Sequence, residues 1–326
     1  MTRSFLTRRQ LLATGAALAA TGLPFAAQAQ GATVKFILPN ATGSGVDAIT
    51  RAAAPALAKA LNASVVVDNQ PGAGGVVGLQ ALARSAPDGT TLSVVSNNVV
   101  IFPSVLKSLP FDMPGDFTPI AVVGATPLVL VANPAKVSAT SAREFFAQLK
   151  ARPGSYNFGS GGNGTILHLA SELVLDAAGV SAKHIPYKGV GPMVTDLLSG
   201  QIDFATAALP SVQQHIAAGT LRPIGALTPQ RAPAMANIPT FAEQGLANFA
   251  VEAWFAVIGP KGMSAAAVKK AHDAVVAAFA DPAVTEAMAK QGNTIQISTP
   301  QQAQAAFRSE LAKYAALVKK VGLEPQ

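Results

Sequence analysis

Val34-Lys35-Phe36-Ile37-Leu38 and, after a short linker, Gly43-Ser44-Gly45-Val46-Asp47 form the stretch that decides the fold. The first run is rich in apolar and β-branched residues, which predicts a buried strand. The second run is rich in glycine and opens a segment, residues 46–61, whose apolar residues recur at helical spacing. Two interpretations of this strand–loop–helix unit are open. It is an anion site built on free N–H groups at the start of the helix, or a tight turn capped by Ser44 or Asp47.

The same alternation of strand and helix continues along the chain. Further strands are predicted at 64–68, 91–96, 128–132, 156–158, 183–186, 204–209, 222–227 and 252–259. Helices are predicted at 74–85, 141–152, 165–178, 190–199 and up to residue 218, and through most of 264–322. The proline-rich stretches 101–119 and 228–245 are predicted to be a connecting loop and a crossover. This order predicts parallel sheets with helices on their faces, arranged as two lobes with a cleft between them.

A second glycine-rich loop lies in the second series, at Gly159-Ser160-Gly161-Gly162-Asn163-Gly164-Thr165. It matches the G-x-G-x-x-G pattern of dinucleotide-binding proteins. That fingerprint also requires an acidic residue about 20 positions further on, which binds the ribose. The corresponding region here is Lys183-His184-Ile185-Pro186, which contains no acid. We therefore exclude a dinucleotide and interpret this loop as a second candidate for an anion site.

The amino-terminal residues carry the features of an export signal. Arg8 and Arg9 precede a small-residue apolar run that ends in Ala27-Gln28-Ala29. A basic start, an apolar middle and an A-x-A end predict a signal peptide at 1–29. The paired arginines are typical of twin-arginine export in bacteria. The apolar run falls short of the roughly 20 residues of a membrane span, so we expect cleavage and not a membrane anchor.

Composition excludes several classes of protein. There are 24 basic and 17 acidic residues, a net charge of +7, and the predicted signal peptide contains three of the arginines. The mild excess that remains, without a run of Lys or Arg, argues against nucleic acid as a partner. The chain has no cysteine, so disulfides, thiolate metal sites and iron–sulfur clusters are excluded. No later segment approaches a membrane span, which predicts a protein that is not embedded in a membrane.

Signals for catalysis or metal binding are weak. His168 and Glu172 lie four residues apart on a predicted helix, but no third metal ligand accompanies them, and we interpret them as a hydrogen-bonding pair. No serine lies in a G-x-S-x-G elbow. Asp47, Asp203 and Glu252 form a carboxylate site only if the fold brings them together, and they are more typical of caps and strand ends. We therefore predict no catalytic residue, no metal and no cofactor.

Seven motifs, taken in order, resemble the Bug family, the extracytoplasmic solute receptors of tripartite tricarboxylate transporters. The resemblance covers essentially the whole chain after residue 29. The motifs are Gly43-Ser44-Gly45-Val46-Asp47, Asp68-Asn69-Gln70-Pro71-Gly72-Ala73-Gly74-Gly75, Ala86-Pro87-Asp88-Gly89-Thr90-Thr91-Leu92, Asn157-Phe158-Gly159-Ser160-Gly161-Gly162-Asn163-Gly164-Thr165, His184-Ile185-Pro186-Tyr187-Lys188-Gly189, Asp196-Leu197-Leu198-Ser199-Gly200-Gln201-Ile202-Asp203 and Ile238-Pro239-Thr240-Phe241-Ala242-Glu243.

The resemblance implies an α/β clamshell of the type II periplasmic-binding-protein kind, each lobe a mostly parallel sheet flanked by helices. The implied lobes are 30–128 plus 252–326, and 129–251. Such receptors hold small carboxylates in the periplasm through backbone N–H groups and bridging waters, and deliver them to a membrane permease. The residues expected to contact the ligand lie mostly in the two loops: Thr42, Gly43, Ser44, Gly45, Asp47, Ser160, Gly161, Asn163, Gly164, Thr165 and Asp203.

The first loop departs from the family pattern. Asn40-Ala41-Thr42 stands where many members carry aromatic and proline residues, and Ser44 replaces a usual glycine. Two alternatives to a transport receptor stay open. One is an exported enzyme, for instance a hydrolase using His168 or His184, and the other is a receptor that docks on a membrane sensor kinase when loaded. A receptor site needs only donors and shape, whereas an enzyme needs a base with a tuned pKa.

Overall fold

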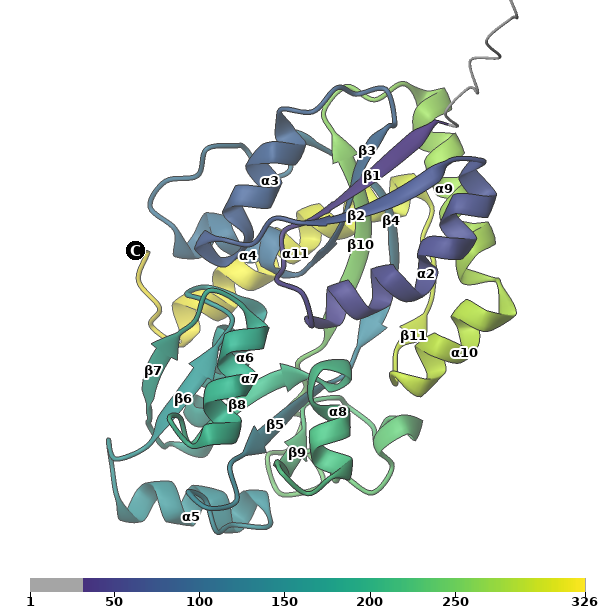
Figure 1. Ribbon diagram of the computed structural model, residues 1–326. Coiled ribbons are helices and arrows are strands. Elements are labelled where there is room, and N and C mark those ends of the chain that lie inside the picture. The colour runs from purple at the N-terminus through teal and green to yellow at the C-terminus, as the bar shows by residue number, and fades with distance from the viewer. Residues whose placement is uncertain (1–31, 326) are drawn as a thin grey trace, which may run out of the picture.

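Two sheets, each with its own helices, make up the computed structural model, which describes residues 32–325 (Figure 1). The predicted signal peptide lies outside the described residues. Lobe I is built on a six-stranded sheet of order β11-β4-β10-β3-β1-β2, and lobe II on a five-stranded sheet of order β7-β6-β8-β5-β9. Within residues 32–325, no helix is both long enough and apolar enough to span a bilayer.

Lobe I takes its elements from both ends of the described chain. Its strands are β1 (Thr33–Leu38), β2 (Ser64–Asn69), β3 (Thr91–Ser96), β4 (Phe117–Thr126), β10 (Ala253–Pro260) and β11 (Thr294–Ile295). Its helices are α2 (Gly45–Leu61), the short η1 (Ala73–Gly75), α3 (Val76–Ala83), α4 (Asn98–Val105), α9 (Ala265–Phe279), α10 (Pro282–Lys290) and α11 (Pro300–Lys320). Helices α2, α9 and α10 share one apolar cluster with the sheet, while α3, α4 and α11 belong to another.

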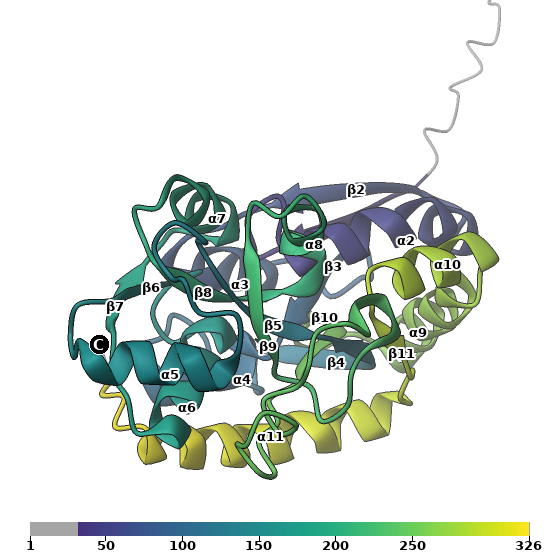
Figure 2. The same ribbon diagram turned by 90° about the horizontal axis from the view of Figure 1, so that it is seen from below.

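Lobe II is continuous in sequence. Its strands are β5 (Leu128–Ala132), β6 (Asn157–Ser160), β7 (Lys183–Pro186), β8 (Phe204–Ala208) and β9 (Arg222–Ala226). Its helices are α5 (Ala142–Ala151), α6 (Ile166–Ala178), α7 (Val190–Ser199), α8 (Leu209–Ala217) and the short η2 (Pro233–Met235). Figure 2 shows α11 of lobe I running along the lower edge of the view toward α5 and α6 of lobe II. At its end Lys320 lies 3.5 Å from Asp176 at the end of α6.

The predicted two-lobed α/β architecture is confirmed, but the sheets are mixed and not mostly parallel. Strands β1, β2 and β3 pair in parallel, as do β6, β7 and β8, whereas β10 and β5 are antiparallel to both of their neighbours. The reason is the route of the chain. Strand β4 passes through Pro127 directly into β5, and the chain returns from lobe II into β10. Each arriving strand runs away from the cleft, while its neighbours run toward it.

The stretch 101–119, predicted to be a loop, is partly regular. It contains the second half of α4 and the start of β4, and neither element was predicted as such. Pro103 lies inside α4 and Pro119 inside β4, and both residues normally argue against these structures. Pro119 pairs with Ile258 of β10 beside an irregularity in the register of the two strands, and such irregularities are where a sheet tolerates proline. The two-residue β11 also escaped prediction.

Candidate functional site

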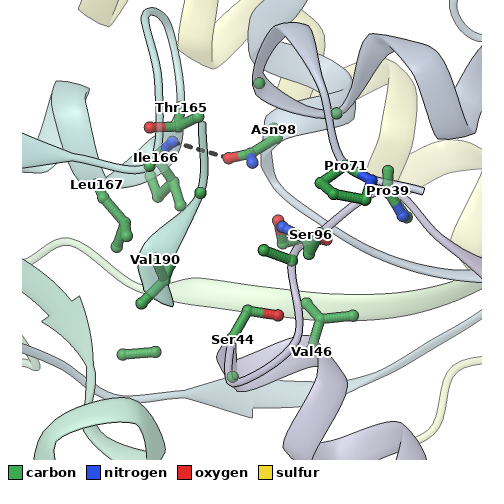
Figure 3. Close-up of a pocket in the computed structure, with 18 of the residues that line it drawn as sticks. Pro39, Ser44, Val46, Pro71, Ser96, Asn98, Thr165, Ile166, Leu167 and Val190 are labelled. Carbon is green, nitrogen blue, oxygen red and sulfur yellow. Dashed lines mark hydrogen bonds between the residues drawn. The ribbon is translucent and has the colours of Figure 1, made fainter. Parts of the chain in front are cut away.

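A cavity of about 60 Å³ lies between the lobes, where the carboxyl ends of strands from both sheets face each other (Figure 3). Ligands of open α/β sheets bind at this edge. From lobe I, the cavity is lined by residues of the segments after β1, β2 and β3 and by Thr126 and Ala253. From lobe II, it is lined by Leu128, Ala208 and residues of the segments 161–167 and 188–190. The apolar part of its wall includes Pro39, Val46, Leu128, Val190 and Ala208.

The first predicted loop reaches the cavity with only part of its residues. Ser44 and Gly45 line the cavity, whereas Thr42, Gly43 and Asp47 do not. Ser44 is the N-cap of α2, and its hydroxyl accepts a hydrogen bond from the N–H of Asp47 at 3.2 Å. The capped-turn interpretation is therefore correct for this loop. It is compatible with the anion-site interpretation, because the capped helix N-terminus itself faces the cavity.

Asp47 holds the first loop together from inside lobe I. It is only 3% exposed. Its Oδ1 accepts from Nε of Arg51 at 2.8 Å and from Nδ2 of Asn69 at 3.0 Å, and its Oδ2 accepts from the N–H of Gly43 at 3.0 Å. Both oxygens of the Asp47 carboxylate therefore already accept hydrogen bonds from other residues of lobe I. The geometry therefore gives Asp47 a structural role.

The second predicted loop is divided in the same way. Gly161 and Thr165 line the cavity, whereas Ser160, Asn163 and Gly164 do not. Thr165 caps α6, accepting from the N–H of His168 at 3.4 Å and donating to the carbonyl of Gly162 at 2.8 Å. Ser160 is 0% exposed, and its hydroxyl donates to the same carbonyl at 3.0 Å. Ser160 thus supports the loop from beneath and does not face the cavity.

Asp203 requires a correction, because the structure does not bring it to the cavity. It precedes β8 and accepts from the N–H of Asn157 at 2.6 Å. Strand β8 runs toward the cleft, and its last residue, Ala208, is the one that lines the cavity. Asp203 therefore lies at the opposite end of the strand. Like the carboxylate of Asp47, the carboxylate of Asp203 accepts a hydrogen bond from its own lobe.

Four neutral polar residues of lobe I were missed by the sequence argument: Asn40, Ser96, Asn98 and Thr126 all line the cavity. Ser96 and Asn98 stand at the carboxyl end of β3, where the rule for open α/β sheets locates ligand contacts. That signal was present in the sequence. Thr126 ends the unpredicted strand β4, so no such signal existed for it. The glycine-rich segment after β2 also lines the cavity, although it entered the prediction only as a family motif.

The charges around the cavity favour an anion. None of the residues that line it is acidic, and its one charged residue, Lys188, has an exposed side chain. Helices α2 and α4 of lobe I begin at Gly45 and Asn98, helices α6 and α7 of lobe II begin at Ile166 and Val190, and all four residues line the cavity. A helix N-terminus carries a partial positive charge and free N–H groups. Two helix N-termini from each lobe therefore lie at the same small cavity.

A pair of stacked histidines lies beneath the second loop. The rings of His168 and His184 are 3.6 Å apart at 11°. His184 Nε2 lies 2.7 Å from the hydroxyl of Ser160, and Nδ1 of His168 accepts from the N–H of Gly164 at 3.2 Å. Burial, with a contribution from the charge of His168, lowers the pKa of His184 to about 3. A stacked pair that lies outside the cavity and bonds to the loop suits support of the loop.

The described residues offer no metal centre. Nε2 of His168 lies 3.6 Å from the carboxylate of Glu172, as the spacing of four predicts. Within residues 32–325, no three His, Cys, Asp or Glu side chains gather in a way that could hold a metal ion. Neither histidine lines the cavity, so the geometry gives the hydrolase alternative no base at the site.

Comparison with known proteins agrees with this geometry. Residues 49–323 match the model of the tripartite tricarboxylate transporter family receptor. The chain is 37% identical over 291 residues to protein BugT of Bordetella pertussis, covering 89% of each chain.

Two solved structures have the same fold. One, a protein of R. palustris solved with adipate, has a TM-score of 0.87 and 27% identity, covering 90% of this chain and 98% of that one. The other, MatC from Rhodopseudomonas palustris with bound malate, has a TM-score of 0.80 and 26% identity, covering 88% and 98%. The matched family consists of solute-binding receptors and not of enzymes. The chain therefore belongs to the receptor family of the tripartite tricarboxylate transporters.

Proposed function

We propose that this protein captures a small carboxylate between its two lobes and delivers it, unchanged, to the membrane permease of a tripartite tricarboxylate-type transporter. The observation that carries the proposal is the cavity itself. The N-termini of α2 and α4 from lobe I and of α6 and α7 from lobe II meet there, and no acidic side chain lines the cavity. A carboxylate matches these donors, and both lobes must contact it before all of them are used.

The relatives support the class of ligand. Adipate and malate, which two neighbours hold, are both dicarboxylates. In this chain we assign the ligand contacts to Ser44, Gly45, Gly161 and Thr165, which line the cavity. We place the lobe boundaries at 30–128 plus 252–326, and at 129–251. Export of the mature chain to the periplasm, directed by residues 1–29, completes the proposal.

A thermal-shift screen of small carboxylates, followed by calorimetry on the hits, tests this function. A ligand at 100 times its Kd raises the free energy of unfolding by about 2.7 kcal/mol. Gly161→Val is the matching variant. An added Cβ at Gly161 has only ordinary contacts, the nearest atom being Cγ2 of Val190 at 3.7 Å, so the variant should fold while narrowing the cavity.

Ala277→Val, at an exposed position on α9, is the control and should bind like the wild type. Failure of every carboxylate to shift the wild-type melting temperature would contradict the proposal. So would unchanged affinity in Gly161→Val. Recovery of a chemically altered ligand after incubation would instead favour an enzyme.

A further inference from the structure

Asn98 bridges the two lobes at the cavity. It is the first residue of α4 in lobe I and is 8% exposed. Its Oδ1 accepts a hydrogen bond of 2.8 Å from the N–H of Ile166, the first residue of α6 in lobe II (Figure 3). A side chain of one lobe therefore satisfies an N–H group at the start of a helix in the other lobe, where the helix itself offers no acceptor.

The same hydrogen bond determines how the amide of Asn98 is oriented. The N–H of Ile166 can only donate, so the atom that it meets must be the oxygen. The NH₂ group then takes the other position, and Figure 3 shows it on the side of the cavity. No described residue accepts a hydrogen bond from Nδ2. Both N–H groups of Nδ2 are therefore available to donate to a ligand or to water in the cavity.

The hydroxyl of Thr126 independently indicates that the ligand of the cavity is polar. Thr126 lines the cavity, is 7% exposed, and its buried hydroxyl has no hydrogen-bond partner. Buried hydroxyls are normally satisfied. Both residues stand on the lobe I side of the cavity, opposite Gly161 and Thr165 of the second loop. The ligand that would satisfy them must carry hydrogen-bond acceptors, which a carboxylate does.

We propose that Asn98 couples ligand binding to closure of the lobes. Its NH₂ donates to the ligand carboxylate while its Oδ1 holds the start of α6. The inference rests on the proposed function and adds a residue and a mechanism to it. A ligand oxygen that accepts from the NH₂ orients the amide, which favours the bond to Ile166. Ligand binding and lobe contact therefore stabilise each other, as differential affinity for the closed state requires.

Asn98→Asp separates the two halves of this role. The aspartate keeps an oxygen that can accept from Ile166, and its negative charge is favourable at a helix N-terminus. It cannot donate to a carboxylate and it repels one. Asn98→Ala removes both interactions. Ser211→Ala is the matched control, because the Ser211 hydroxyl forms an exposed hydrogen bond of 3.1 Å to the carbonyl of Gly43 in the other lobe.

Calorimetry with malate and adipate as probes, combined with small-angle scattering, measures binding and closure. Loss of a hydrogen bond to a charged group corresponds to about a 10- to 100-fold increase in Kd. We expect at least this increase for Asn98→Asp and Asn98→Ala, and little change for Ser211→Ala. With saturating probe, Asn98→Ala should have a larger radius of gyration than the wild type. In buffer alone, Asn98→Asp should be at least as compact as the wild type.

Each arm has an outcome that overturns the inference. If Asn98→Asp binds the probes as tightly as the wild type, Asn98 is only structural. If Asn98→Ala with saturating probe is as compact as the wild type, there is no coupling. If neither these probes nor any other carboxylate binds the wild type, the proposed function fails. In that case scattering of Asn98→Asp and Asn98→Ala in buffer still decides whether the bridge to Ile166 exists.

Discussion

At the scale of single residues, the second loop is held by the hydroxyl of Ser160, which does not line the cavity. Ser160 donates to the carbonyl of Gly162 and accepts from the N–H of Gly162 at 3.2 Å. With its one proton used, it must accept from His184 as well, which makes Nε2 the protonated nitrogen of that ring.

Ser160→Ala should therefore destabilise the protein, because it leaves the N–H of Gly162 and Nε2 of His184 without this acceptor. An unsatisfied buried group costs about 1–3 kcal/mol, a loss that denaturant unfolding will measure. The control is Ser199→Ala, which removes an exposed hydroxyl bonded to the carbonyl of Asp196 and should change the free energy of unfolding little. Equal stability of both variants would contradict the supporting role of Ser160.

The histidine stack should make stability depend on pH. The pKa of His184 is about 3 in the folded protein and 6.5 as its ordinary value. Between these values the unfolded chain binds more protons, so the free energy of unfolding should be highest above pH 6.5 and fall as the pH drops toward 3. The groups that face His184 are the rings of His168 and Phe158 and the hydroxyl of Ser160.

NMR titration of the His184 ring protons measures the pKa, and denaturation at each pH measures the stability. His184→Phe keeps a ring against Phe158 and removes the titrating group, so its stability should fall less over the same range. A His184 resonance that titrates near pH 6.5 would refute the assignment.

At the scale of secondary-structure elements, the start of α6 serves both stability and binding. Thr165→Ala removes the N-cap, which costs about 1 kcal/mol. It also loosens the first turn, whose residues Ile166 and Leu167 line the cavity. Ser264→Ala removes the equivalent cap of α9, whose hydroxyl accepts from the N–H of Ala267 at 3.2 Å.

Both variants should lose a similar free energy of unfolding, measured in denaturant, and only Thr165→Ala should bind the carboxylate more weakly, measured by calorimetry. A parallel loss of affinity in Ser264→Ala would show that the effect on binding is a general loss of stability.

Most elements were predictable because their patterns are local. Strand β3 was predicted at 91–96 and β5 at 128–132, as observed, and α7 was predicted at its observed bounds of 190–199. The mixed sheets were not predictable, because the direction of β5 and β10 depends on the chain crossing between lobes. The same limit applies to the site. The glycine-rich loops after strands led to the prediction of Ser44, Gly45, Gly161 and Thr165, which line the cavity, but Asp203 was assigned without knowing which end of β8 faces the cleft.

At the scale of the whole molecule, closure depends on small residues where the lobes touch. A Cβ added to Gly45 of α2 would lie 3.0 Å from Cβ of Ala208 in lobe II. Gly45→Ala should leave the fold of each lobe unchanged, but the added methyl group should oppose closure of the two lobes. Overpacking costs about 1–3 kcal/mol, so Kd should rise about tenfold or more.

Adding Ala208→Gly removes the opposing methyl group and should restore most of the affinity, which calorimetry on both single variants and the double variant will measure. If the double variant binds no better than Gly45→Ala, the contact between these two residues does not limit closure.

The division of lobe I between the two ends of the chain has a consequence for how the protein is made. Strand β10 lies between β3 and β4, yet it comes more than a hundred residues after both of them. Pairings between residues so distant in sequence form late, because a long loop must first close. Synthesis proceeds from the amino terminus, so β1 to β4 leave the ribosome without the strand that completes their sheet. Lobe II, whose strands all lie between 128 and 226, can assemble first. Lobe I stays incomplete until β10 has been synthesised, although lobe II can already be folded. During this interval the unpaired strand edges of lobe I are the part of the nascent protein most prone to aggregation.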